Sequence, residues 1–310
     1  MSDFSKKRVA YINSWPNSKP FEAENNYKYR CEQFCEMYGS FPFSPMKLWD
    51  DNDDTFNRAI SHLIDGLEMM PLKPNYAFTF MFSGLDFYAK SKYSGNTTVS
   101  LKHLADDLAI SATANSDVKG LLTTLFSAIP VNACVYLYKC LCGMSNHNSN
   151  VNTRVTTDLN NTGLADHSCI VNAIANHYGY DVNNYNTSIR QAALLYRHIF
   201  SEDNVQIVGN PTAITDKFRI YLLLLGFIYS LRNDALHGSS MSSTKSSQTT
   251  PERYALNYYA FLSAYTIFTW VIIEKSSLSQ TVKDLKFTEL KQNTEVNIDR
   301  FKKLFGNHIR

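Results

Sequence analysis

Three polar side chains lie at the end of a strongly apolar segment of this 310-residue chain, and their types suit proton transfer and anion binding. Arg232, Asn233 and His237 end the run that begins at Phe218. Polar groups at the end of an apolar helix are costly to bury unless they have partners or a function. In an ideal helix Asn233 and His237 are one turn apart and offset by about 40°, so both can address one point. Arg232 is offset from His237 by about 140°, and its long side chain reaches that point only if the last turn frays.

These residue types suit the cleavage of RNA without a metal ion. The reaction needs a base that deprotonates a ribose 2′-OH, a cation that stabilises the phosphorane, and an acid that protonates the leaving 5′-oxygen. Histidine can act as either acid or base near neutral pH, and arginine binds phosphate. We therefore expect His237 to be the acid or base, Arg232 to bind the scissile phosphate and Asn233 to orient the site. The expected products carry a 2′,3′-cyclic phosphate and a 5′-OH.

The run RNDALH, residues 232–237, resembles the motif of the HEPN superfamily (higher eukaryotes and prokaryotes nucleotide-binding domains), in which an arginine and a polar residue precede a histidine. The resemblance includes the helices expected over 214–237 and 251–275. It implies an all-α helical bundle and a metal-independent endoribonuclease that needs no cofactor. It also implies RNA as a partner, a homodimer with a composite site, and a toxin or antiviral-defence effector that an antitoxin or sensor controls.

Two other interpretations of the same residues stay open. A HEPN-like fold without nuclease activity would use them to bind a nucleotide, an RNA or a partner protein. A purely structural helix end would satisfy them with internal hydrogen bonds, leaving Arg232 buried and fully paired.

The segment after the motif, residues 238–250, is small and polar, as in a flexible loop. Lys245 within it and Arg253 just beyond it are candidates for contacts with RNA phosphates. The alternative is a solvated connector in which neither residue has a ligand.

The elements around the motif predict an all-α fold, a HEPN-like helical bundle with additional helices and an irregular N-terminal arm. Apolar residues recur at threes and fours, and strand signals are few. Helices are expected over residues 55–70, 75–92, 101–111, 117–129, 131–142, 165–178, 188–200, 214–237 and 251–275, and after residue 280.

The chain divides into four segments by composition. Residues 1–55 form the arm, because Pro16, Pro20, Pro42 and Pro45 argue against long helices there, although a short helix over 27–37 is allowed. The others are N-terminal helices over 56–142, a polar loop or linker over 143–164, and the HEPN-like helical region over 165–310.

Composition limits the function further. A formal charge of only +2 excludes a global attraction to nucleic acid, so a polyanion site must be local. Six cysteines in 310 residues are too few to suggest a disulfide framework, and the first 20 residues do not resemble a secretion signal. We therefore expect a cytoplasmic protein with reduced thiols. The apolar stretch over 254–273 holds several polar side chains, which favours a buried helix and no membrane contact. Cys134, Cys140, Cys142 and His147 lack the paired spacing of a zinc site, so we expect no metal.

Overall fold

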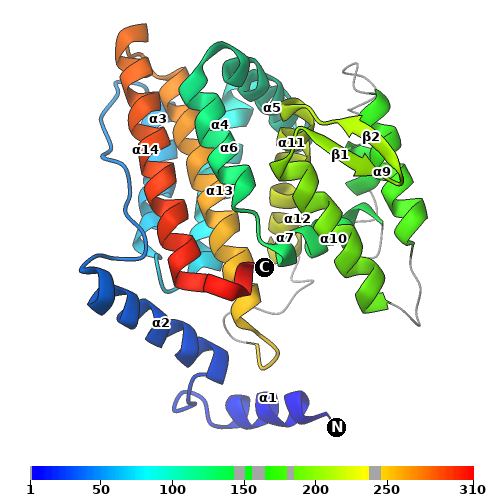
Figure 1. Ribbon diagram of the computed structural model, residues 1–310. Coiled ribbons are helices and arrows are strands. Elements are labelled where there is room, and N and C mark those ends of the chain that lie inside the picture. Colours follow the sequence, from blue (N-terminus) through cyan, green and yellow to red (C-terminus); the bar gives the residue numbers. More distant parts are fainter. Residues whose placement is uncertain (1, 143–150, 156–164, 180–184, 237–245) are drawn as a thin grey trace.

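The computed structural model describes residues 2–142, 151–155, 165–179, 185–236 and 246–310 (Figure 1). Helices make up most of these segments, and the predicted all-α fold class is confirmed. The elements in chain order are α1 (Asp3–Asn13), α2 (Glu22–Tyr38), α3 (Asp54–Glu68), α4 (Pro74–Tyr93), α5 (Thr97–Ala114), α6 (Ser116–Ser127), α7 (Val131–Leu141), α9 (Ala165–Tyr178), α10 (Tyr185–Ser201), β1 (Asn204–Ile207), β2 (Asn210–Ala213), α11 (Asp216–Tyr221), the π-helical segment η1 (Leu222–Ile228), α12 (Tyr229–Leu236), α13 (Pro251–Lys275), α14 (Gln280–Phe305) and a final 3-10 turn η2 (Gly306–Ile309).

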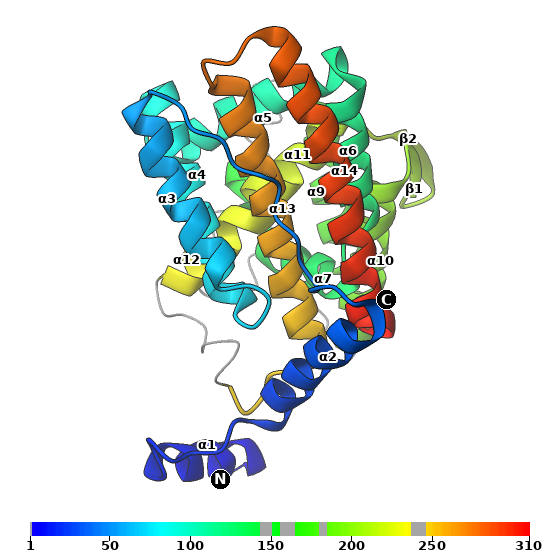
Figure 2. The same cartoon turned by 90° about the vertical axis from the view of Figure 1, so that its left-hand side faces the viewer.

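Helix α13 is the centre of the bundle. Every residue from Tyr254 to Ile273 is buried, as expected of a helix that is apolar on all sides. The turned view in Figure 2 shows α3 and α4 on one side of α13 and α14 and α6 on the other. Among the described helices α13 alone has the length and composition of a membrane span, and its most apolar window is wholly buried; α6 and α7 meet the same test only jointly, with a bend of 90° between them.

The N-terminal arm is more helical than predicted. Its four prolines lie between or after helices, so they interrupt none of them: two separate α1 from α2, and two follow α2. The prediction of an irregular segment is wrong for residues 3–13 and 22–26 and agrees with residues 39–53, and the short helix allowed over 27–37 lies within α2. Helix α2 packs on the bundle through a buried face whose Tyr27 ring stacks on Tyr254 at 4.3 Å between centroids.

The polar segment predicted over 143–164 also contains a packed piece. Residues 151–155 are helical, and Val151 and Val155, one turn apart, are fully buried. The linker prediction is therefore wrong for these five residues, while 143–150 and 156–164 lie outside the described residues.

A two-stranded antiparallel hairpin, β1 and β2, was not predicted. Its strands pair from Asn204 with Ala213 to Ile207 with Asn210, which leaves Val208 and Gly209 as a two-residue turn. Both turn residues have positive φ, 48° for Val208 and 85° for Gly209. A β-branched residue rarely adopts that conformation, so Val208 departs from the Asn-Gly or Asp-Gly pair that usually marks a two-residue turn.

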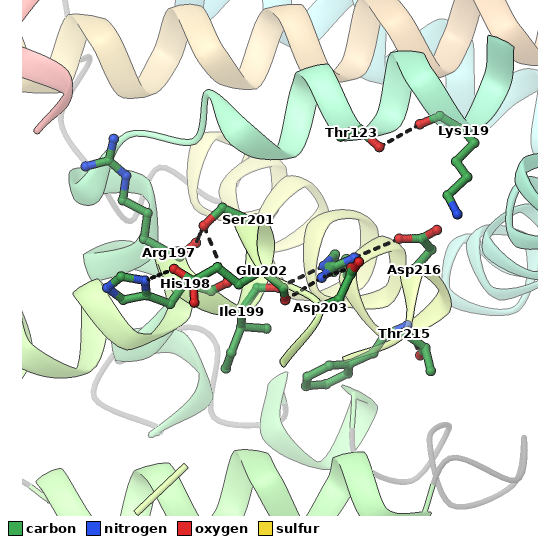
Figure 3. Close-up of polar contacts among 12 residues, drawn as sticks. Lys119, Thr123, Arg197, His198, Ile199, Ser201, Glu202, Asp203, Thr215 and Asp216 are labelled. Atoms are coloured by element: carbon green, nitrogen blue, oxygen red, sulfur yellow. Dashed lines mark hydrogen bonds and ion pairs between the residues drawn. The ribbon is translucent and has the colours of Figure 1, made fainter. Parts of the chain in front are cut away.

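Arg219 ties this hairpin to the helices on either side. Its side chain is only 5% exposed and forms ion pairs with Asp203 at 3.0 Å and Asp216 at 2.8 Å. Figure 3 labels both carboxylates. Arg219 also donates to the backbone carbonyls of Ile199 and Glu202. These four bonds give Arg219 a structural role, because they join the end of α10 and the residues after it to α11, where the helical stretch that leads to residue 236 begins.

Candidate functional site

The helix that ends in the RNDALH run is not a regular α-helix. Between α11 and α12 lies the π-helical segment η1, and the Tyr229 amide donates to the Leu224 carbonyl, five residues back. One extra residue per turn rotates α12 by about 100° relative to a regular continuation of α11. The face that α12 presents therefore cannot be extrapolated from α11. Short π segments occur frequently at functional sites.

Arg154 supports the π segment from a distant part of the chain. Its Nη2 donates to the Leu225 carbonyl at 2.5 Å and to Ser230 Oγ at 2.9 Å. The guanidinium also lies 4.3 Å from the centroid of the Tyr229 ring. Arg154 belongs to the segment interpreted as a polar loop, and sequence analysis missed it. The valines three residues before it and one after it were the only signal that this segment packs against the core.

The structure brings Arg232 and Asn233 together in the last turns of α12. Arg232 Nη1 donates to Asn233 Oδ1 at 3.1 Å, and both residues are half-buried. The Arg232 guanidinium lies 5.4 Å from the centroid of the Phe82 ring of α4. Phe82 is parallel to Tyr229, with centroids 6.2 Å apart and an interplanar angle of 4°. The contacts thus form one continuous stack of two cations and two aromatic rings, in the order Arg154, Tyr229, Phe82 and Arg232.

Asp234 points to a different side of α12. It is buried and accepts a 2.7 Å hydrogen bond from the Tyr136 hydroxyl of α7. Residues two apart in a helix face nearly opposite directions, so Asp234 and Arg232 are on different faces of α12. The side chain of Asp234, the only carboxylate of the run, is therefore directed into the protein interior.

Arg253 lies beside Asp234 and Tyr136, in the first turn of α13. Burial lowers the pKa of its guanidinium, and the neighbouring Tyr136 and Asp234 act in the opposite sense. An arginine remains protonated in this environment at neutral pH. Within the described part of the chain, no hydrogen bond or ion pair engages this guanidinium.

Cys140 of α7 lies near the same polar groups, where Tyr136, Asp234, Arg154 and Ser230 affect its ionisation. Burial raises the pKa of the thiol to about 12, so Cys140 stays protonated at neutral pH and is not a nucleophile. Among the described residues, no group of three His, Cys, Asp or Glu side chains could hold a metal ion. His147, the histidine near this cysteine-rich stretch, lies outside them.

The structure describes some of the predicted site residues and not others. Arg232 and Asn233 are in contact, and Arg253 lies on the Asp234 side of α12. His237 and Lys245 lie outside the described residues, between the end of α12 and residue 246.

No protein-family model, no curated protein and no solved structure matches this chain. Its function is inferred from the residues of the site.

Proposed function

We propose that this protein is a metal-independent endoribonuclease whose active site lies at the end of α12. The observation that carries the proposal is that Arg232 and Arg253 are half-buried cations that form no ion pair with any described residue. Buried cations are normally paired. Arg219 shows how this fold pairs a structural arginine, with two carboxylates and two carbonyls. Two guanidinium groups that lack such partners among the described residues favour an anionic ligand, and arginine matches phosphate geometry.

In the proposed reaction the 2′-oxygen of the substrate attacks the adjacent phosphorus and the bond to the 5′-oxygen breaks. His237 takes the 2′-OH proton or gives a proton to the leaving 5′-oxygen. Arg232 stabilises charge on the phosphorane, and Asn233 holds its guanidinium through the 3.1 Å bond. Arg253 and Lys245 contact neighbouring phosphates. The products are a 2′,3′-cyclic phosphate and a 5′-OH.

The resemblance of the RNDALH run to the HEPN superfamily extends the proposal. A homodimer would join two motifs in one composite site, and the protein would act as a cytoplasmic toxin or antiviral-defence effector held in check by an antitoxin or sensor. In such a dimer the second copy's histidine could serve as the second of the two proton-transfer groups.

A non-catalytic module that binds RNA or a nucleotide is the alternative function. One observation favours it: Arg232 and Arg253 are associated with different faces of α12, on the Phe82 side and the Asp234 side. Cations distributed in this way suit an extended phosphate backbone as well as a single scissile phosphate.

Cleavage of total cellular RNA in the presence of EDTA, with the product ends mapped, separates these functions. The variants are His237→Ala, Arg232→Ala and, as a matched control, His177→Ala, which removes an exposed histidine from α9. We expect the wild type and His177→Ala to produce cyclic-phosphate ends and the two site variants to lose activity. Equal cleavage by wild type and His237→Ala would overturn the assignment of His237. RNA binding without cleavage by the wild type would support the non-catalytic module.

A further inference from the structure

Helix α1 has no place in the hydrophobic core. None of its residues is buried, and an isolated helix of this length is marginal in water. Figures 1 and 2 show it at one end of the molecule, beyond α2 and away from the bundle. Contacts with the rest of the chain include the Tyr11 ring, which stacks on Phe21 with centroids 4.7 Å apart, and the Ser247 hydroxyl, which donates to the Phe4 carbonyl at 3.0 Å.

The segment from the N-terminus through α1 to Pro20 has a high density of positive charge. Its residues up to Pro20 include Lys6, Lys7, Arg8 and Lys19 and a single carboxylate, for a net charge of +3. The whole chain carries only +2, so the remainder is slightly acidic. The arm is therefore a local basic region on a protein that has no overall attraction for polyanions.

Cationic and apolar side chains alternate around α1. At about 100° per residue, Arg8 lies between Phe4 and Ile12, and Lys6 and Lys7 flank Ala10. A helix that lies on a membrane separates its charged face from its apolar face, and α1 does not. Cations interleaved with exposed rings, among them Trp15 at 67% exposure just after the helix, are typical of surfaces that bind single-stranded nucleic acid.

The arm adjoins the chain that returns from the candidate site. Phe4, Lys7 and Phe21 line a pocket of about 270 Å³ together with residues 246–247 and 249–251. Those residues lead directly into the first turn of α13, where Arg253 lies. Substrate held on α1 would thus be close to the segment that connects the motif with Arg253.

We propose that residues 3–19 form a single-stranded RNA-binding arm that holds substrate for the site at the end of α12. Lys6, Lys7 and Arg8 contact the phosphates, and Trp15 stacks on a base. The proposal rests on the proposed ribonuclease function for its choice of nucleic acid.

The test measures binding of a short single-stranded 2′-O-methyl oligoribonucleotide to the full-length protein over a range of salt concentrations. This probe cannot be cleaved because its 2′-oxygen carries a methyl group. The arm variant is Lys6→Ala/Lys7→Ala/Arg8→Ala, and the matched control is Lys47→Ala/Lys73→Ala/Lys119→Ala, which removes three exposed lysines outside residues 3–19. Urea unfolding checks that both fold, as expected since α1 buries nothing.

We expect the arm variant to bind more weakly than the control and its slope of log affinity against log salt to fall by about 2, since each lost phosphate contact removes about 0.7. Trp15→Ala should weaken binding about tenfold with little change in slope. Equal affinity and slope for the arm variant and the control would overturn the proposal. So would binding of the wild type to phosphatidylserine vesicles and not to the oligonucleotide.

The two proposals can fail separately. If the wild type binds the probe through the arm but cleaves no RNA, the ribonuclease function fails and the arm stands. If the wild type cleaves RNA and the arm variant binds and cleaves like the control, the arm fails and the ribonuclease stands.

Discussion

The Tyr136 hydroxyl of α7 donates a 2.7 Å hydrogen bond to Oδ2 of Asp234, the third residue of the RNDALH run. This bond turns the only carboxylate of the run toward the protein interior. Arg232, two residues earlier, faces the other way and lies on Phe82. The positive charge of Arg232 is therefore not neutralised by its nearest acidic neighbour in the sequence.

The Tyr136–Asp234 bond should contribute measurably to stability. Tyr136→Phe removes the donor and leaves a buried carboxylate oxygen without it, so the free energy of unfolding should fall by about 1–3 kcal/mol. Urea unfolding measures the change. Tyr29→Phe, which removes the hydroxyl of an exposed tyrosine, is the control and should change stability by less than about 0.5 kcal/mol. Equal effects of the two substitutions would contradict a structural role for the bond.

Arg154 should be needed to hold the π-helical segment. Arg154→Met keeps a long side chain over the Tyr229 ring but removes the donor to the Leu225 carbonyl, so we expect a loss of about 1–3 kcal/mol in the free energy of unfolding. RNA cleavage should also decrease, because α12 follows this segment directly. Arg190→Met, at an exposed position of α10, is the control. Identical unfolding curves for the two variants would show that the contacts of Arg154 contribute nothing.

Arg232 should act through its planar guanidinium as well as its charge. Arg232→Lys keeps the charge but loses the two-pronged donor geometry and the packing on Phe82. If the proposed function holds, the rate of RNA cleavage should fall by roughly 10²-fold, the usual effect of removing one donor to a transition-state oxyanion, with the fold unchanged. Single-turnover cleavage measures this rate. Wild-type activity in Arg232→Lys would mean that a positive charge alone suffices.

The contact between α4 and α13 leaves no room for a methyl group at Gly84. A Cβ there would lie 2.6 Å from two ring atoms of Phe268, which is fully buried. Gly84→Ala should therefore destabilise the protein by about 1–3 kcal/mol even though alanine favours a helix. At Gly120 the added Cβ would meet only the end of the Lys291 side chain, at 2.9 Å, which can move. Urea unfolding should show Gly120→Ala to be as stable as the wild type or more stable, and a similar loss at both positions would contradict this account.

Protonation of Asp107 at low pH should lower the free energy of unfolding. Its Oδ2 accepts from Tyr93 at 2.6 Å and from Lys275 at 2.8 Å. Burial raises the pKa of this carboxyl, but the bonds to Lys275 and Tyr93 outweigh burial and hold the pKa below its usual value. A depressed pKa in the folded state stabilises the protein above the unfolded pKa of about 3.9, and this contribution is lost as the pH falls through the lower folded value.

Asp107→Asn removes this titration. The free energy of unfolding of the wild type should therefore fall more steeply than that of Asp107→Asn as the pH drops from about 5 to 3. Urea unfolding at several pH values measures both slopes, and parallel curves would contradict the predicted linkage.

The fold class and most of the helices follow from the amino-acid sequence. The segments expected over 165–178 and 251–275 coincide with α9 and α13. The segment over 75–92 differs from α4 by one residue at each end, and the segment over 131–142 differs from α7 by one residue at its C-terminal end. Helix formation follows local rules, namely apolar residues at threes and fours, capping side chains and prolines at helix starts, so a short window of sequence contains the needed information. The contact of Arg232 with its neighbour Asn233 is local in the same sense.

The surroundings of that pair depend on the tertiary structure. The bonds of Arg154 to the π segment and the bond from Tyr136 to Asp234 join residues about 70 to 100 positions apart in the chain. Such contacts form only when helices pack, because they depend on which buried donor meets which acceptor, and no helical periodicity encodes that choice. Helix α1, the start of α2 before residue 27 and the hairpin turn at Val208 escaped prediction for related reasons. Prolines lie between α1 and α2, and the turn uses a residue that is disfavoured there.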